Sequence, residues 1–158
     1  MSQNSVMQHL KTELIQVLVE TFERSNGIYL YQGTSLFETL EGVSAEQASR
    51  PVCSEGTTLA AQVKHTAFYL GVLEEYVVAN KTDSVDWAGI WLRVKAVTSE
   101  EWEVIRCELK TAYQHLLATV KAIENWDENE VSGIVAIASH SAYHLGVIRQ
   151  ALHTVLSS

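Results

Sequence analysis

Apolar residues recur every three or four positions in four long stretches of the chain, a spacing that places them on one face of an α-helix. The first stretch predicts a helix over residues 6–24, which Gly27 follows as a stop signal. The second predicts a helix from Thr57 or Thr58 to residue 79. Their apolar rows are Leu10, Leu14, Val17, Leu18 and Phe22 in the first, and Leu59, Val63, Thr66, Leu70, Leu73 and Val77 in the second.

The second half of the chain predicts two further helices. Thr98 and Glu101 have the spacing of a capping box, so a third helix is expected to follow Thr98 and to continue to about residue 125. Asp127 supplies an N-cap for a fourth helix over 128–156. The apolar rows are Trp102, Ile105, Leu109, Tyr113, Leu116 and Val120 in the third helix, and Ile134, Ile137, Ala138, Ser141, Leu145, Ile148, Leu152 and Val155 in the fourth.

The connections between these helices differ in length and composition. After the first helix, short helices are predicted over 35–40 and over 45–48. The connection over 80–97 carries Trp87 and Trp91. Because each tryptophan brings a large area that prefers burial, we expect this connection to lie against the helices.

Four amphipathic segments, with the two longest connections after the first and second, predict an all-α fold, a four-helix bundle. The 158 residues suit a single domain over 1–158, long enough to bury a core. Only 8 glycines and 1 proline interrupt the chain, which favours long helices.

Charge and cysteine content narrow the function classes. The formal charge of -8 argues against nucleic acid or an anionic membrane surface as a partner, because both require a basic face. Cys53 and Cys107 form no disulfide framework and no CxxC pair, and are expected to be structural or incidental. The polar residues 1–8 lack the pattern of a signal peptide, and no uninterrupted apolar run has membrane-spanning length. A cytoplasmic location is therefore expected.

The most informative polar feature is the pair His140 and His144, four residues apart in the predicted fourth helix. Such residues lie one turn apart on the same face and can bind one metal ion. Both flank the apolar row, so they are expected to face inward, an unusual direction for polar side chains. His65 lies at the edge of the second helix's row and becomes a third ligand if the second and fourth helices are neighbours.

The same spacing has a second interpretation, in which inward histidines are satisfied by hydrogen bonds alone. Imidazole ligands also suit zinc, nickel, copper and iron alike, so they do not select the metal. The remaining histidines, His9, His115 and His153, are expected at the surface or at an edge.

Several other sites are excluded by their motifs. His140 and His144 enclose Ser-Ala-Tyr, whereas the HExxH motif of zincins needs a glutamate base after its first histidine. Carboxylate-bridged di-iron bundles require Glu-x-x-His on two helices, and this pattern is absent. Neither a GxGxxG nor a P-loop motif is present for a nucleotide.

Three stretches resemble the DinB superfamily, also called DinB/YfiT-like metalloenzymes. TLAAQVKHTAFYL (58–70) resembles the family's second helix with its first histidine, and DWAGIWLRVKAVTSEEWEVIRCEL (86–109) resembles a Trp-rich crossover and the start of the third helix. The most specific stretch, ASHSAYHLGVIRQAL (138–152), resembles the closing HxxxH helix. With the helix order, the resemblance extends over nearly the whole chain.

This resemblance implies a four-helix bundle with a long crossover between helices two and three, and a divalent metal on His65, His140 and His144. Zinc or nickel is the expected ion, with iron or manganese as alternatives. Related proteins include thiol-dependent transferases and isomerases, so a small-molecule substrate and a low-molecular-weight thiol are expected partners. By their positions, one turn after His65 and beside His144, Tyr69 and Tyr143 are candidate contacts to a ligand histidine or to the substrate, with ordinary packing as the alternative. Arg149 is a candidate anchor for an anionic substrate, with a surface ion pair as the alternative.

Three functions from different classes remain open from the sequence. One is a metal-dependent enzyme, a thiol S-transferase or a hydrolase, in which the ion activates a thiol or water. Another is a non-catalytic, stress-associated protein in which the metal ties two helices together. The third is an interaction module without metal. A homodimer is expected because bundles of this size often pair through an apolar helix face.

Overall fold

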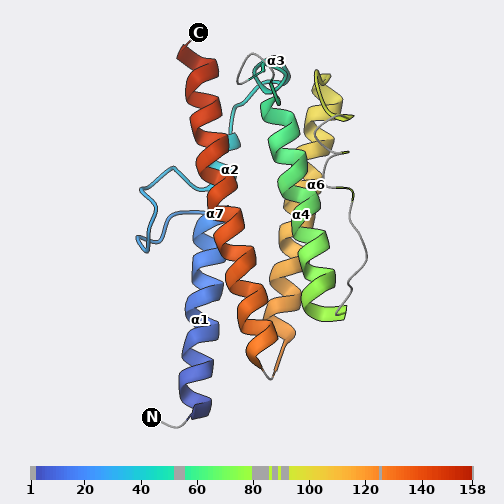
Figure 1. The fold of residues 1–158 in the computed structure, drawn as a ribbon. Helices are drawn as coiled ribbons and strands as arrows, with labels where there is room; N and C mark the ends of the chain where they lie inside the picture. Colours follow the sequence, from blue (N-terminus) through green and yellow to red (C-terminus); the bar gives the residue numbers. More distant parts are fainter. Residues whose placement is uncertain are drawn as a thin grey trace.

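The computed structural model describes residues 3–51, 56–79, 86, 89, 93–124 and 126–157, and this part of the chain is all-helical (Figure 1). Within it, the only strand-like feature is an isolated bridge between Pro51 and Thr58. The helices are α1 (Gln3–Phe22), α2 (Leu36–Leu40), α3 (Ala45–Ala48), α4 (Leu59–Ala79), α6 (Ser99–Ala122) and α7 (Glu128–Ser157).

Four long helices, α1, α4, α6 and α7, lie side by side, and two short helices occupy the connection after α1 (Figure 1). Helix α7 packs against α1 and α4, and α4 packs in turn against α6. The colours of Figure 1 show that α4 and α6 run in the same direction, whereas α7 runs opposite to α4. Apolar residues from all four helices meet in one buried core.

Helix α6 begins where its capping box predicts. The Glu101 carboxylate accepts a hydrogen bond from the Thr98 backbone N–H at 2.7 Å, and the Thr98 hydroxyl accepts one from the Glu101 N–H at 3.2 Å. The predicted apolar row is buried along its whole length. The helix ends at Ala122, earlier than predicted, with Ile123 as its extended C-cap residue.

The starts of α4 and α7 are also stabilised by the predicted caps. The Thr58 hydroxyl accepts a hydrogen bond from the Ala61 N–H at 3.2 Å. At α7, Asp127 accepts hydrogen bonds from the N–H groups of Asn129 at 2.7 Å and Glu130 at 3.3 Å. These caps fix the ends of the two helices that carry the candidate site, and α7 continues to Ser157.

Helix α1 begins at Gln3, before the predicted start at residue 6. It ends at Phe22, two residues before the predicted end at residue 24. The fully buried Glu20 carboxylate accepts backbone hydrogen bonds from Ile28 at 2.8 Å, Tyr29 at 3.0 Å and Leu30 at 2.7 Å. Burial by itself would raise the pKa of Glu20, but these N–H donors outweigh it and lower the pKa. Glu20 therefore anchors the segment that follows α1.

The short helices α2 and α3 match the two predicted over 35–40 and 45–48, and each has a capping box. The Trp102 indole N–H donates to the Val43 carbonyl at 2.8 Å, which ties the connection between them to α6. Trp87 and Trp91 lie outside the described residues.

Helix α7 meets the criteria of length and apolar composition for crossing a membrane, over Glu128–Leu156. Core helices of soluble proteins also meet these criteria, which makes one such helix weak support for a membrane assignment. One face of α7 contributes to the core with α1 and α4, and the same face carries polar His144.

Candidate metal centre

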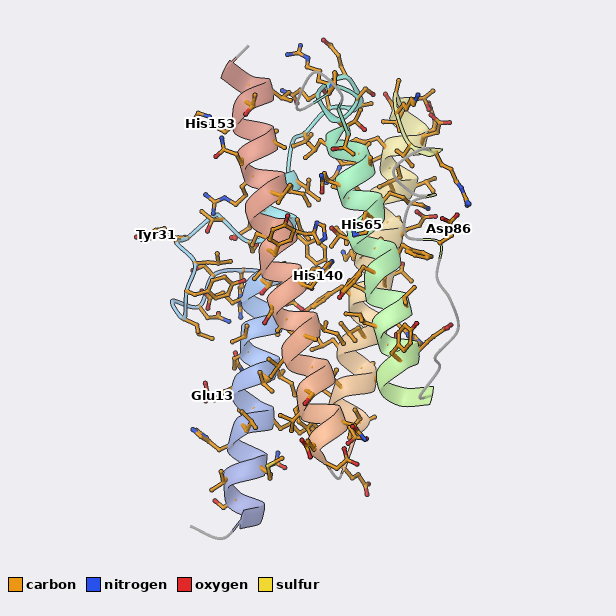
Figure 2. The ribbon with its side chains drawn as sticks, in the orientation of Figure 1. Glu13, Tyr31, His65, Asp86, His140 and His153 are labelled. Carbon is orange, nitrogen blue, oxygen red and sulfur yellow. The ribbon has the colours of Figure 1, made fainter. Side chains whose placement is uncertain are left out.

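The structure brings His65 of α4 together with His140 and His144 of α7. Figure 2 shows His65 and His140 between these two helices. Each of the three histidines offers a ring nitrogen, and the three nitrogens lie within 4.8 Å of one another. The ring centroids are 4.8 Å apart for His65 and His144, 4.3 Å for His140 and His144, and 6.1 Å for His65 and His140.

The packing of α4 against α7 explains this cluster. His140 and His144 lie one helical turn apart and therefore share a face of α7. His65, from the neighbouring and oppositely directed α4, lies at the level of this pair. His65 is 6% exposed and His144 is 4% exposed, whereas His140 is half-buried. The prediction that His140 and His144 face inward is confirmed, and His65, predicted at the edge of its helix's row, is buried as well.

Hydrogen bonding distinguishes His144 from an ordinary buried histidine. Among the described residues, neither ring nitrogen of His144 has a hydrogen-bond partner, and the same holds for Nε2 of His140. Buried polar atoms are nearly always paired, and leaving one unpaired costs about 1–3 kcal/mol. The alternative in which hydrogen bonds alone satisfy these inward rings therefore does not describe His144.

Burial also determines the charge state of the three rings. The pKa of His144 falls to about 3, because of burial and the nearby His140 and His65. The pKa of His65 falls to about 4, because of burial and His140, and burial lowers the pKa of His140 too. At neutral pH the rings are therefore uncharged and keep the lone pairs that a metal ion needs.

Two tyrosines flank the cluster. The Tyr69 ring of α4 stacks on His140, with centroids 3.4 Å apart and planes 15° from parallel. Tyr143 of α7 contacts His144 edge-on, at 5.2 Å and 75°, and is 65% exposed. The two tyrosines that were candidates because of their sequence positions thus lie at the histidines, but only Tyr69 covers a ring face.

Two buried polar groups close to the histidines in the sequence were not predicted to be part of the site. The Ser141 hydroxyl oxygen and the Gln62 amide oxygen are buried, and within the described chain neither has a hydrogen-bond partner. Ser141 follows His140 directly, and Gln62 lies one turn before His65 on α4. The sequence could have indicated Ser141, because it is a polar residue in an otherwise apolar row. No sequence feature indicated Gln62.

The other candidate residues lie apart from the cluster. His9 and His153 are exposed, as predicted. His115 is also exposed, but its Nδ1 is 2.7 Å from Glu74 of α4, a pairing that the sequence did not indicate. The Arg149 guanidinium donates to the Thr34 carbonyl at 3.4 Å. Cys107 is a free, exposed thiol, and Cys53 lies outside the described residues.

The donor set fits a divalent transition metal. Uncharged imidazoles are ligands for zinc, nickel, copper and iron. Ligands of one tetrahedral ion at about 2.1 Å lie about 3.4 Å apart, so the observed limit of 4.8 Å calls for a small inward movement of the rings. Three protein ligands leave at least one coordination position for water or substrate, as in catalytic zinc sites.

Compared with known proteins, the chain matches no family model, no curated protein and no solved structure at a significant level. The geometry of the three histidines therefore carries the functional argument.

Proposed function

We propose that this protein binds one divalent metal ion through His65, His140 and His144, and that it is a metal-dependent enzyme of the DinB type. The observation that carries the proposal is the meeting of three uncharged imidazoles, two of them almost fully buried, between α4 and α7. The unpartnered nitrogens of His144 support it, because an ion bound to one of them would offset the desolvation cost of that nitrogen. Zinc or nickel is the expected ion.

The fold belongs to the same proposal. We infer a four-helix bundle formed by α1, α4, α6 and α7, with a long crossover between α4 and α6. The side-by-side packing of these helices supports this architecture, as does the common direction of α4 and α6 (Figure 1). Helices that run in the same direction need a connection that returns along their length, and the chain from residue 80 to residue 98 is long enough for that return.

The chain's own residues define what this site can do. His65, His140 and His144 hold the ion between two helices, and their lowered pKa values keep protons from competing for the nitrogens. A bound divalent ion supplies Lewis acidity that lowers the pKa of a coordinated thiol or water. Tyr69 and the apolar core limit the access of bulk water to His140 and His144.

Metal content tests the site directly. Untagged protein, purified beside a His140→Ala, His144→Ala double variant, is to be measured by elemental analysis after incubation with zinc or nickel. We expect about one ion per chain in the parent protein and none in the double variant. No metal in the parent protein would overturn the proposal and leave the interaction module as the function to test.

The reaction that we propose for this centre is transfer to or from a low-molecular-weight thiol. Its test is the visible spectrum of cobalt-substituted protein during titration with a small thiol. We expect a new sulfur-to-cobalt charge-transfer band, absent when the corresponding alcohol is added. An unchanged spectrum at saturating thiol would remove the central step of this reaction and favour hydrolysis by an activated water.

A non-catalytic role is the second candidate, and the position of the histidines favours it. Because they join α4 to α7, metal binding adds directly to folding stability. X-ray absorption of the zinc protein separates the two functions. An ion whose whole coordination shell consists of protein atoms would favour the structural role, whereas an exchangeable water or thiol favours the enzyme.

Three further predictions concern the surroundings of the protein. We expect a homodimer, a cytoplasmic location, and no nucleic-acid or membrane partner. Gel filtration with light scattering at micromolar concentration tests the first, and a monomer there would exclude it.

A further inference from the structure

Tyr69 differs from the other aromatic residues near the histidines because its ring lies flat on a metal-ligand candidate. It follows His65 by four residues on α4, so the two share a face of that helix. Its partner in the stack is His140 of the opposite helix, with ring centroids 3.4 Å apart and planes 15° from parallel. Tyr69 therefore connects one ligand helix to a ligand on the other.

The orientation of His140 matters because the lone pair of an imidazole nitrogen lies in the plane of the ring. A metal ion must lie in that plane, and the terminal torsion of a histidine side chain is only loosely restricted by itself. His140 is also the least buried of the three histidines, so the core restrains it less than the others. Some other contact has to fix its plane.

A ring stacked face to face supplies that restraint. Rotation of the His140 ring about its terminal torsion would drive its edge into the Tyr69 ring, whereas the observed plane leaves both rings in contact. In this plane the Nε2 atom of His140 lies on the buried side. Positive charge placed on the imidazole by an ion would further favour contact with the electron-rich face of tyrosine.

We propose that Tyr69 is a positioning residue of the metal centre, whose ring fixes the plane of His140 and so aims Nε2 at the point shared with His65 and His144. This inference rests on the proposed metal binding. The positioning role is assigned to the aromatic face of Tyr69 and not to its hydroxyl. Interactions that orient a metal ligand typically change metal affinity about 10–100-fold when they are removed.

Zinc affinity in three variants tests the role of the ring, measured by competition with a coloured chelator. Tyr69→Leu is expected to bind zinc about tenfold more weakly than the parent protein, and Tyr69→Phe within about threefold of it. Phe68→Leu is the matched control, because Phe68 is the adjacent aromatic residue and lines the groove between α4 and α6 instead. It is expected to keep the parent affinity.

The visible spectrum of the cobalt protein gives a second readout that a purely structural role would not change. We expect Tyr69→Leu to alter the cobalt band shape and Tyr69→Phe to preserve it. If Tyr69→Leu is unfolded in chelator by circular dichroism, Tyr69→Met replaces it, because methionine fills the space without a flat face.

The possible results separate this inference from the proposed function. A parent protein that binds no zinc overturns both. Parent affinity in Tyr69→Leu, with only its thermal stability in chelator reduced, overturns the positioning role and leaves the metal site intact. Equal weakening in Tyr69→Phe and Tyr69→Leu would assign the effect to the hydroxyl and would also overturn the inference.

Discussion

Helix α4 packs against α6 through one face and against α7 through another, and polar side chains lie on both. On the α6 side they pair with one another. Lys64 forms an ion pair with Glu108, and the nearly buried Glu74 accepts a hydrogen bond from the Thr119 hydroxyl and pairs with His115 at 2.7 Å. These pairs border a groove of about 600 Å³ with a mainly apolar lining.

On the α7 side the polar groups include three imidazoles, and the pairing is incomplete. Both nitrogens of His144, and Nε2 of His140, have no hydrogen-bond partner among the described residues. Such groups do not contribute to the stability of the fold, because unpaired buried polar atoms destabilise the folded state. The α6 face of α4 thus holds its polar groups in paired contacts, whereas its α7 face retains unpaired nitrogens of the kind that a ligand could satisfy.

The largest expected effect is the loss of metal affinity in His144→Ala. This variant removes the most buried of the three candidate ligands, so zinc affinity should fall by more than about 100-fold, beyond the range typical of groups that only orient a ligand. Isothermal titration calorimetry of untagged protein provides the measurement. His153→Ala, an exposed histidine on the same helix, is the control and should bind like the parent protein.

Removal of His144 with unchanged zinc affinity would show that the ion binds elsewhere. The comparison between the two faces of α4 would then lose its functional meaning, and the α6 side with Glu74 and His115 would become the next place to examine.

The second prediction concerns the stability of the metal-free protein as the pH falls. An unfolded histidine has a pKa of about 6.5, whereas the folded values are about 3 for His144 and about 4 for His65. Between these values the unfolded state binds more protons, so the free energy of unfolding decreases as the pH falls below about 6.5. Each histidine can contribute a slope of up to about 1.4 kcal/mol per pH unit.

Urea unfolding of metal-free protein from pH 7.0 to 5.0 measures this slope. The range lies above the unfolded pKa of carboxylates, so Glu20, whose pKa is lowered, contributes little to it. His65→Leu, His144→Leu should flatten the dependence. A parent protein with a flat stability profile over this range would show that the imidazoles are solvated and not buried.

The third prediction is a smaller change in the free energy of unfolding, which has opposite signs for variants on the α7 face and the α6 face of α4. In metal-free protein, His144→Leu should raise the free energy of unfolding by about 1–2 kcal/mol, because it replaces an unpaired buried polar group with an apolar one of similar size. Glu74→Leu should lower it, because it leaves the Thr119 hydroxyl and His115 without their acceptor. Equilibrium unfolding in chelator measures both.

If His144→Leu destabilises the metal-free protein as strongly as Glu74→Leu does, then His144 already has partners in solution and its polarity needs no ligand. Gain of stability with loss of zinc binding is the pattern expected where a site is maintained for function.

Much of the fold and of the histidine cluster was predictable because the relevant signals are local. The capping box of Thr98 and Glu101 and the apolar row of α6 lie within one helix, as does the spacing of His140 and His144. Periodicity also indicates which face is buried. The end of α1 was predicted less well, since Glu20 binds a segment that periodicity does not describe.

The contacts that could not be predicted from the sequence are those that depend on the register between helices. The stack of Tyr69 on His140 requires one particular register between α4 and α7. The sequence of either helix alone does not determine this register. The pairing of Glu74 with His115 likewise depends on how α4 meets α6 across 41 positions of the chain. His115 was correctly predicted to be exposed, but its partner lay on another element.

The smallest expected effect is that of His115→Ala, the counterpart of His144→Ala on the other face of α4. The His115 side chain is 75% exposed and forms an ion pair with Glu74 only when its ring is protonated, and exposed ion pairs contribute about 0–1 kcal/mol. The variant should therefore lower the free energy of unfolding by less than about 1 kcal/mol, in a salt-dependent manner, while Glu74 keeps the hydrogen bond from Thr119. Zinc affinity should stay at the parent value.

A loss of zinc affinity in this variant would contradict the assignment of the α6 face to folding, since it would make His115 and Glu74 part of a second metal-binding group. Urea unfolding at low and high salt, together with the calorimetric titration used for His144→Ala, decides between these outcomes.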